Sequence, residues 1–276
     1  MKISNVLKMT LITLLLGVGF AACGNKNNDK SQSAEKKLVK MTTGHVGKNF
    51  NASMYKTFSY HTDGRLIEVT TSSILHSGDT VTHTYKYVWN TNSIDVTEEL
   101  SFSSIPTPEA KQLKYTMNLS DGLARSLTYK EHPSDNITYN YDASNRLQHT
   151  SDGYSNIYNE WDNDKLISIT RKSERREYIT TFTYGEYRPI KGYLPLVPNE
   201  IVNNPLFVAH PELGGMKTSQ IYVSKTIAFS DKPDLTDNIS QFEYEFDKDG
   251  YISKITSPDK TDGNDSTQTV FTFIWE

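Results

Sequence analysis

YNYDASNRLQH, residues 139–149, is the stretch that decides the fold, because variants of it recur along the chain. Aromatic residues alternate with polar ones, a turn rich in Asp, Asn and Gly follows, and a second alternating run starts after Arg, Lys or Tyr. Alternation with a period of two places the aromatic side chains on one face of a β-strand. Each copy therefore predicts a β-hairpin with one apolar face.

The copies share this pattern but differ in sequence. The close copies are FSYHTDGRLIEV (58–69), YNEWDNDKLISI (158–169) and FEYEFDKDGYISKI (242–255), and the looser ones are YKYVWNTNSIDV (85–96) and YTMNLSDGLARSL (115–127). Their turns contain residues that supply a positive φ or tolerate it. These residues are the pairs Asp63-Gly64, Asp121-Gly122 and Asp249-Gly250, and the single residues Asn145, Asn163 and Asp164.

The spacing of the turns predicts the whole fold. Most of them lie about 20 to 30 residues apart, which fits one hairpin per repeat. The 17 tyrosines and 11 phenylalanines also favour strands. We expect an all-β antiparallel meander of about 10–13 strands. So long a sheet should curl strongly or close into a barrel, because open sheet edges invite aggregation.

The first 22 residues have the features of a secretory signal peptide. Met1–Lys8 carries two lysines and no acid, and the apolar run Met9–Phe20 and two alanines follow. The run is shorter than the roughly 20 residues that a membrane-spanning helix needs. Cys23, the single cysteine, resembles the acylated cysteine of the bacterial lipoprotein lipobox, with Phe20 where that pattern usually has Leu. The alternative is a soluble secreted protein cut just before Cys23.

Acylation would make Cys23 the anchor of an outer membrane lipoprotein in a Gram-negative bacterium, facing either the periplasm or the cell surface. Residues 23–37 are polar and are expected to form a flexible tether, and residues 38–276 a single β-domain. The formal net charge is −4, or −6 once the two lysines of the signal peptide are removed. An acidic chain argues against nucleic acid as a partner. We expect a monomer.

Two resemblances to known families support this interpretation. Tyr139-x-Tyr141-Asp142-x-x-Asn145-Arg146-Leu147 resembles the tyrosine-aspartate repeats of bacterial Rhs-type shell proteins, which build long spiralling β-sheets. About residues 38–276 resemble uncharacterised Bacteroides-type lipoproteins, a domain-of-unknown-function family with a porin-like fold. That resemblance rests on the lipobox, the repeated hairpins and the stretch Asn204-Pro205-Leu206-Phe207. It implies a porin-like barrel and no activity.

Residues 185–215 (GEYRPIKGYLPLVPNEIVNNPLFVAHPELGG) interrupt the meander. Half of the ten prolines lie here, and proline is excluded from central strands. The segment nevertheless keeps many apolar residues, so we expect it to be packed, with one short helix around Pro205–Leu213. We consider two roles for it, one as a plug in one end of the curled sheet and the other as the lining of a pocket mouth.

The alternate positions of the strands predict a polar outer face. These positions are occupied by Ser59, His61, Lys86, Asn140, Glu243 and Glu245. A membrane-spanning barrel would instead need apolar residues on its outward face for about ten positions per strand. The sequence therefore predicts a soluble barrel, porin-like in shape alone.

Motifs for catalysis or metal binding are missing from the sequence. The seven histidines form no HExxH or other close ligand pair, and there is no GxSxG elbow, P-loop or dinucleotide fingerprint. Asp247-Lys-Asp249-Gly250 resembles part of a calcium loop, but the same residues form one of the repeated hairpin turns. We favour the hairpin turn over a calcium site. We expect no catalytic residue, no metal and no cofactor.

Three residues stand out as weak candidates for binding. Trp89 and Trp161 occupy equivalent places before their turns, where they could stack on a ligand or fill the core. Glu160 interrupts an aromatic position and could face a concave surface or solvent. The favoured function is a binding or interaction module for a glycan, a peptide or a partner envelope protein. The alternatives are a structural or lipid-shuttling lipoprotein with a half-open barrel, and a polysaccharide hydrolase that would need two carboxylates in one cleft.

Overall fold

Antiparallel β-strands make up nearly all of the described structure, a computed structural model, together with three short helices. The strands are β1 (Leu38–Val46), β2 (Ser53–Tyr60), β3 (Leu66–Ile74), β4 (Thr80–Trp89), β5 (Ser93–Phe102), β6 (Lys111–Ser120), β7 (Leu123–Tyr129), β8 (Ile137–Tyr141), β9 (Leu147–Ser151), β10 (Ser155–Asp162), β11 (Lys165–Ser173), β12 (Glu177–Tyr184), β13 (Tyr222–Phe229), β14 (Asn238–Gln241), β15 (Glu243–Phe246), β16 (Ile252–Asp259) and β17 (Thr267–Trp275). The helices are the 3-10 turn η1 (Pro133–Asp135), α1 (Pro205–Ala209) and the 3-10 turn η2 (Pro211–Gly214).

The structure describes residues 35–46, 53–75, 77–103, 111–174, 176–186, 190–194, 204–218, 220–229, 238–259 and 267–276. These residues all belong to one unit, Glu35–Glu276. The predicted signal peptide, Cys23 and the tether up to residue 34 lie outside the described residues, so their predictions stay predictions.

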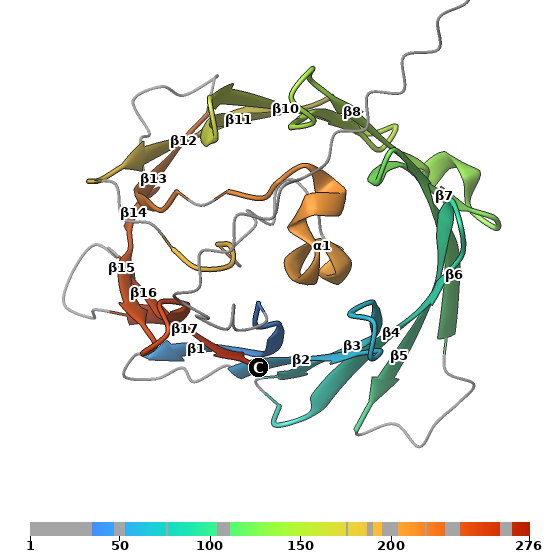
Figure 1. The fold of residues 1–276 in the computed structure, drawn as a ribbon, viewed down its shortest axis with the longest axis horizontal. Helices are drawn as coiled ribbons and strands as arrows, with labels where there is room; N and C mark the ends of the chain where they lie inside the picture. The colour runs from blue at the N-terminus through green and yellow to red at the C-terminus, as the bar shows by residue number, and fades with distance from the viewer. Residues whose placement is uncertain are drawn as a thin grey trace, which may run out of the picture. The chain divides into compact units, whose positions relative to one another are not determined.

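The strands form a meander that returns to its first strand. Each strand pairs antiparallel with its neighbour in the chain, and β17 pairs with β1 from Leu38 opposite Trp275 to Val46 opposite Gln268. β14 and β15 act as two halves of one strand, because β14 pairs with β13 and β15 pairs with β16. Figure 1 shows the resulting ring of strands. The predicted all-β, barrel-like fold is confirmed.

The sheet has 17 strands, more than the 10–13 expected. The count rises where one strand is divided in two, as in β14 and β15, and the pairing of strands also extends their length. In β5, Thr97, Glu98 and Glu99 follow the apolar half of the strand, and the repeat pattern ends before them. Pairing with β4 and β6 extends the strand beyond its apolar pattern. Tertiary context therefore overrides local strand preference here.

The hairpin turns have the predicted backbone conformation. In the turn of the opening phrase, the Asp142 N–H donates to the Arg146 carbonyl and the Asn145 N–H donates to the Asp142 carbonyl. Asn145 takes a positive φ of 61°, as a three-residue hairpin loop requires. Gly64 and Gly250 do the same in the equivalent turns, with φ of 94° and 93°. Asn163 also has a positive φ, of 52°.

An aromatic residue near each of several turns donates a side-chain hydrogen bond to a neighbouring strand. We call these residues the turn-end aromatics: Tyr60, Trp89, Tyr141, Trp161, Tyr184, Tyr244 and Trp275. In the same order, their acceptors are the backbone carbonyls of Leu38, Leu66, Ala124, Leu147, Leu166, Tyr222 and Ile252, at 2.6 to 3.0 Å. Each acceptor lies just beyond the end of a backbone ladder. The aromatic side chain therefore replaces a missing backbone partner.

The interior of the ring contains residues 190–194 and 204–218, most of which belong to the Pro-rich interruption, and we call them the inner segment. Figure 1 shows α1 inside the ring of strands. Leu206 and Phe207 are completely buried, and the Phe207 ring meets Tyr139 of β8 edge-on at 5.7 Å. The side chain of Asn204 accepts a hydrogen bond from the Leu206 N–H and begins the helix.

A glycine fixes the inner segment to the sheet. The Gly215 carbonyl accepts a hydrogen bond from the Leu147 N–H of β9 at 3.2 Å. A Cβ at Gly215 would lie only 2.5 Å from the Asn145 carbonyl oxygen, and its φ is 62°. The close approach therefore requires glycine at this position.

Polar side chains cover the outer face at the positions predicted from the alternation. Ser59, Lys86, Asn140, Glu243 and Glu245 are all exposed. Facing inward between them are buried residues such as Phe58, Tyr87 and Tyr139. In the described part of the chain, no helix has both the length and the apolar character to cross a membrane.

Candidate functional site

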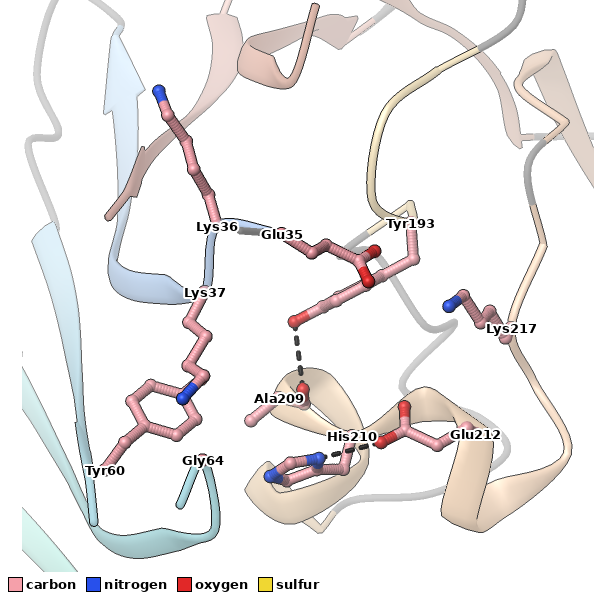
Figure 2. A pocket seen from close by; sticks show the side chains of 10 residues that line it. All are labelled: Glu35, Lys36, Lys37, Tyr60, Gly64, Tyr193, Ala209, His210, Glu212 and Lys217. Atoms are coloured by element: carbon pink, nitrogen blue, oxygen red, sulfur yellow. Dashed lines mark hydrogen bonds and ion pairs between the residues drawn. The ribbon is translucent and has the colours of Figure 1, made fainter. Parts of the chain in front are cut away.

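A pocket of about 210 Å³ opens where the chain enters β1 and meets the inner segment. Figure 2 shows its walls. The entering segment contributes Glu35, Lys36 and Lys37, β2 and its turn contribute Tyr60 and Gly64, and the inner segment contributes Tyr193, Ala209, His210, Glu212 and Lys217. All of these except Gly64 and Ala209 carry a polar side chain.

The entering segment is held firmly, although the sequence placed it in the tether. Lys37 exchanges two backbone hydrogen bonds with Glu276, at 2.6 and 2.9 Å. The Lys36 N–H donates to the Tyr251 hydroxyl at 3.0 Å. These contacts fix the backbone of Lys36 and Lys37 at the pocket wall.

Lys36 occupies the turn that resembles a calcium loop. Its ammonium lies 3.1 Å from an Asp247 carboxylate oxygen and 2.7 Å from an Asp249 oxygen. The hydrogen bonds to Asp249 and Asp247 raise the pKa of Lys36. Asp247 Oδ1 also accepts the N–H groups of Asp249 and Tyr251, so the carboxylates organise a turn. Among the residues that the structure describes, no three acidic, His or Cys side chains gather as metal ligands would.

Lys37 turns into the pocket over an aromatic ring. Its Nζ lies 5.3 Å from the centroid of the Tyr60 ring, within the range of a cation–π contact. A Cβ at Gly64 would come within 2.9 Å of the same Nζ. Gly64 therefore serves both the left-handed turn and the space that the lysine occupies.

His210 and Glu212 form a hydrogen-bonded pair on the opposite wall. His210 Nδ1 lies 2.8 Å from Glu212 Oε1. A carboxylate only accepts hydrogen bonds, so Nδ1 carries the proton, and in the neutral imidazole Nε2 is a bare acceptor. Nε2 is buried without a hydrogen-bond partner, and the ring packs edge-on against Tyr60 and Trp89 at 6.2 and 5.6 Å. The Glu212 carboxylate is the polar group that this pair presents to the pocket.

Nearby charges act on the ionisation of Glu212. Burial works to raise its pKa, but the hydrogen bond from His210 and the charge of Lys217 are among the causes that outweigh it and hold the pKa below its usual range. Glu212 is therefore ionised at neutral pH, which favours the Nδ1–H form of His210.

The two tyrosines form part of the pocket wall, and their hydroxyls do not serve as hydrogen-bond donors to a ligand. The Tyr60 hydroxyl donates to the Leu38 carbonyl at 2.8 Å, and the Tyr193 hydroxyl donates to the Ala209 carbonyl at 3.1 Å. Burial raises the pKa of both hydroxyls well above the usual value. Both hydroxyls stay neutral, and each donates its hydrogen bond to a backbone carbonyl.

The residues that the sequence singled out lie outside the pocket lining. Trp89 packs behind His210 and donates to Leu66. Trp161 donates to the Leu147 carbonyl, and the exposed Glu160 accepts a hydrogen bond from the Ser168 hydroxyl on the outer face. The structure does not bring these three side chains together in the pocket.

Sequence reasoning missed the residues that form the pocket. Glu35 and Lys37 continue the polar run that follows Cys23, and Lys217 is one lysine among many. The signal that could have been used is local, because His210-Pro-Glu212 puts an imidazole and a carboxylate within reach inside an apolar, Pro-rich segment.

Three solved structures are similar to this chain to different degrees. A porin-like protein from Bacteroides uniformis superposes with a TM-score of 0.62 at 16% identity, covering 87% of this chain and 98% of that one. A porin-like protein from Bacteroides vulgatus gives a TM-score of 0.38 at 10% identity, covering 88% and 99%. A β-barrel-like protein of a domain of unknown function from Brucella abortus gives 0.28 at 9% identity, covering 87% and 100%.

Only the first of these likenesses is strong enough to carry weight, and it shows a porin-like barrel fold. No protein-family model matches the chain, and no curated protein matches it. The function therefore has to be argued from the pocket.

Proposed function

We propose that this protein is a lipid-anchored binding module of the cell envelope, which holds a small polar molecule in the pocket between its entering segment and inner segment. The observation that carries the proposal is the polar pocket itself, which brings Glu35 and Lys37 of the entering segment to the hydrogen-bonded pair His210 and Glu212 of the inner segment. A concave site with a few convergent polar groups is typical of small-molecule binding.

The size and polarity of the pocket favour a small solute. At about 210 Å³ it lies below the roughly 300–1,000 Å³ of pockets that hold drug-sized ligands. A single sugar ring or amino acid suits this space better than a glycan chain or a long peptide. Its polar lining also gives no support to the alternative of lipid shuttling, which needs an apolar cavity for acyl chains.

A polysaccharide hydrolase receives less support than a binding module. Glu35 and Glu212 both line the pocket, as a pair of catalytic carboxylates would. A glycosidase acid, however, needs a raised pKa, whereas the pKa of Glu212 is lowered. Glu212 is also held by His210, so it orients the imidazole rather than protonating a leaving group.

The anchor belongs to the same proposal. Acylation of Cys23 would fix the barrel to the outer membrane, facing the periplasm or the cell surface, with the membrane as its partner. The polar outer face, with exposed Lys86, Asn140 and Glu243, supports an anchored rather than an inserted barrel. We propose a monomer without nucleic-acid partners and without catalytic activity.

A ligand screen tests the binding function. The soluble chain from residue 24 would be screened by thermal shift against monosaccharides, amino acids, short peptides and peptidoglycan fragments, and hits would be measured by calorimetry. Glu212→Gln should weaken a hit at least tenfold, because the amide no longer fixes the tautomer of His210. Glu243→Gln, an exposed acid on β15, is the matched control and should leave affinity unchanged. Absence of any hit, or equal effects of the two variants, would contradict the proposal.

A further inference from the structure

We propose that the ligand of this pocket is a small zwitterion of the free amino-acid type, whose carboxylate pairs with Lys37 and whose ammonium pairs with Glu35. This inference rests on the proposed binding function and adds the chemical class of the ligand. It comes from the arrangement of charges on the two walls of the pocket.

The entering segment presents one charge of each sign to the pocket. Glu35 and Lys37 both line it, while Lys36 between them points away, to Asp247 and Asp249 (Figure 2). In extended chain, side chains two residues apart leave on the same side, about 7 Å apart. Neither Glu35 nor Lys37 forms an ion pair with the residues that the structure describes. Both charges are therefore free to pair with a ligand.

The inner segment repeats this arrangement from the other side. Glu212 and Lys217 both line the pocket, and the charge of Lys217 contributes to holding the pKa of Glu212 low. Figure 2 shows Lys217 across the pocket from Lys37, with Glu35 between them. Apart from Lys36, whose ammonium is paired with Asp247 and Asp249, each wall carries one ammonium and one carboxylate.

The presence of both carboxylates and ammonium groups argues against a ligand that carries charge of one sign only. An anionic ligand would meet two carboxylates, and a cationic ligand would meet two ammonium groups, at a cost that rises as water is excluded. A ligand with both charges finds a partner for each. The rings of Tyr60 and Tyr193 give the apolar surface.

The experiment titrates the twenty free amino acids against the soluble chain by calorimetry. For the tightest of them, the N-acetyl derivative lacks the ammonium and the carboxamide lacks the carboxylate. We expect each derivative to bind at least tenfold more weakly than the free amino acid. Equal binding of either derivative would overturn the zwitterion, while the binding function would stand.

Two variants assign the two charges. Glu35→Gln should weaken the free amino acid tenfold and leave the N-acetyl derivative unchanged, because that derivative has no ammonium to lose. Lys37→Gln should weaken the free amino acid but not the carboxamide. Lys40→Gln, which removes an ammonium from over the Tyr55 ring at 6.0 Å, is the control and should change nothing.

The failures of the two proposals are distinguishable. If no amino acid binds but a sugar or peptide of the wider screen does, the zwitterion is overturned and the binding function is kept. If nothing in either screen binds, both proposals fail.

Discussion

The indole Nε1 of Trp89 donates a 2.7 Å hydrogen bond to the backbone carbonyl of Leu66, 23 residues earlier in the chain. The other turn-end aromatics make the same bond to their neighbouring strands. The bond explains why most copies have Tyr or Trp just before the turn, since Phe has no donor. The copy at 242–255 has Phe246 in that place and makes the bond from Tyr244, two residues earlier. The repeat in the sequence is thus a repeat of one contact around the ring.

Removing one such donor should destabilise the barrel. Tyr244→Phe keeps the ring but deletes the hydroxyl that donates to the Tyr222 carbonyl at 2.6 Å. We expect the free energy of unfolding to fall by about 1–2 kcal/mol, because a half-buried carbonyl loses its partner. Urea unfolding measures this. Tyr158→Phe, at an exposed outer position, should change it by less than about 0.5 kcal/mol.

The left-handed turn residue should discriminate between small side chains. Asn145 has a φ of 61°, which alanine adopts at a cost of about 1–2 kcal/mol and glycine without strain. Asn145→Ala should therefore be less stable than Asn145→Gly by about 1 kcal/mol in denaturant unfolding. Asn140 lies in the middle of β8, where glycine weakens a strand. There Asn140→Gly should be less stable than Asn140→Ala. The same order at both sites would refute this account of the turn.

The inner segment should contribute strongly to stability. Phe207 is fully buried, and its ring packs edge-on against Tyr139. The ring also lies so close to Gly214 that a Cβ there would come within 2.8 Å of it. Phe207→Ala should lower the free energy of unfolding by about 3–5 kcal/mol through lost burial and a cavity. Val88→Ala, at a side chain that is 61% exposed, serves as the control. A small effect at Phe207 would mean that the inner segment is not part of the core.

Acid should loosen the entering segment from its turn. Burial works to raise the pKa of Asp247, but hydrogen bonds from the Tyr251 and Asp249 N–H groups and from Lys36 outweigh it and lower the pKa. A carboxyl with a lowered folded-state pKa stabilises the fold above its unfolded value, about 4, and loses this contribution as the pH falls through the folded value.

The variant Asp247→Asn tests that pH dependence. The difference in unfolding free energy between the wild-type protein and the variant should be constant from pH 5 to 7 and shrink below about pH 4. Denaturant unfolding across this range measures it. A difference that does not change with pH would show that the Asp247 charge contributes nothing.

Acylation of Cys23 is a separate prediction. Cells expressing the full chain and fed an alkyne-bearing palmitate should label the protein, and Cys23→Ala should abolish the label. The labelled protein should sediment with outer membranes. Protease treatment of intact cells then distinguishes surface exposure, in which the protein is cleaved, from the periplasm, in which it is protected.

The fold could be predicted because its determinants are local. Alternation and turn residues such as Gly64, Asn145 and Gly250 act within one hairpin, and the structure has each in the expected conformation. The lengths of the strands could not, since strands such as β5 are completed by pairing with their neighbours rather than by their own pattern.

The pocket could not be predicted because it is assembled from segments far apart in the chain. Lys37 and Glu212 are brought to one space by pairing of the chain entry with Glu276 and by burial of Phe207. No pattern in the sequence encodes that meeting. Trp89 was singled out for its aromatic surface, and the structure gives it a hydrogen bond and a place behind His210.

The most direct test of the binding function is to map a bound ligand by NMR. The tightest hit of the screen would be titrated into ¹⁵N-labelled protein, with the ring nitrogens of His210 and the amides of Lys37, Gly64 and Lys217 observed. The account predicts saturable shifts at these groups, with Nδ1 of His210 protonated throughout. Shifts confined to residues elsewhere, or none at all with every hit, would contradict it.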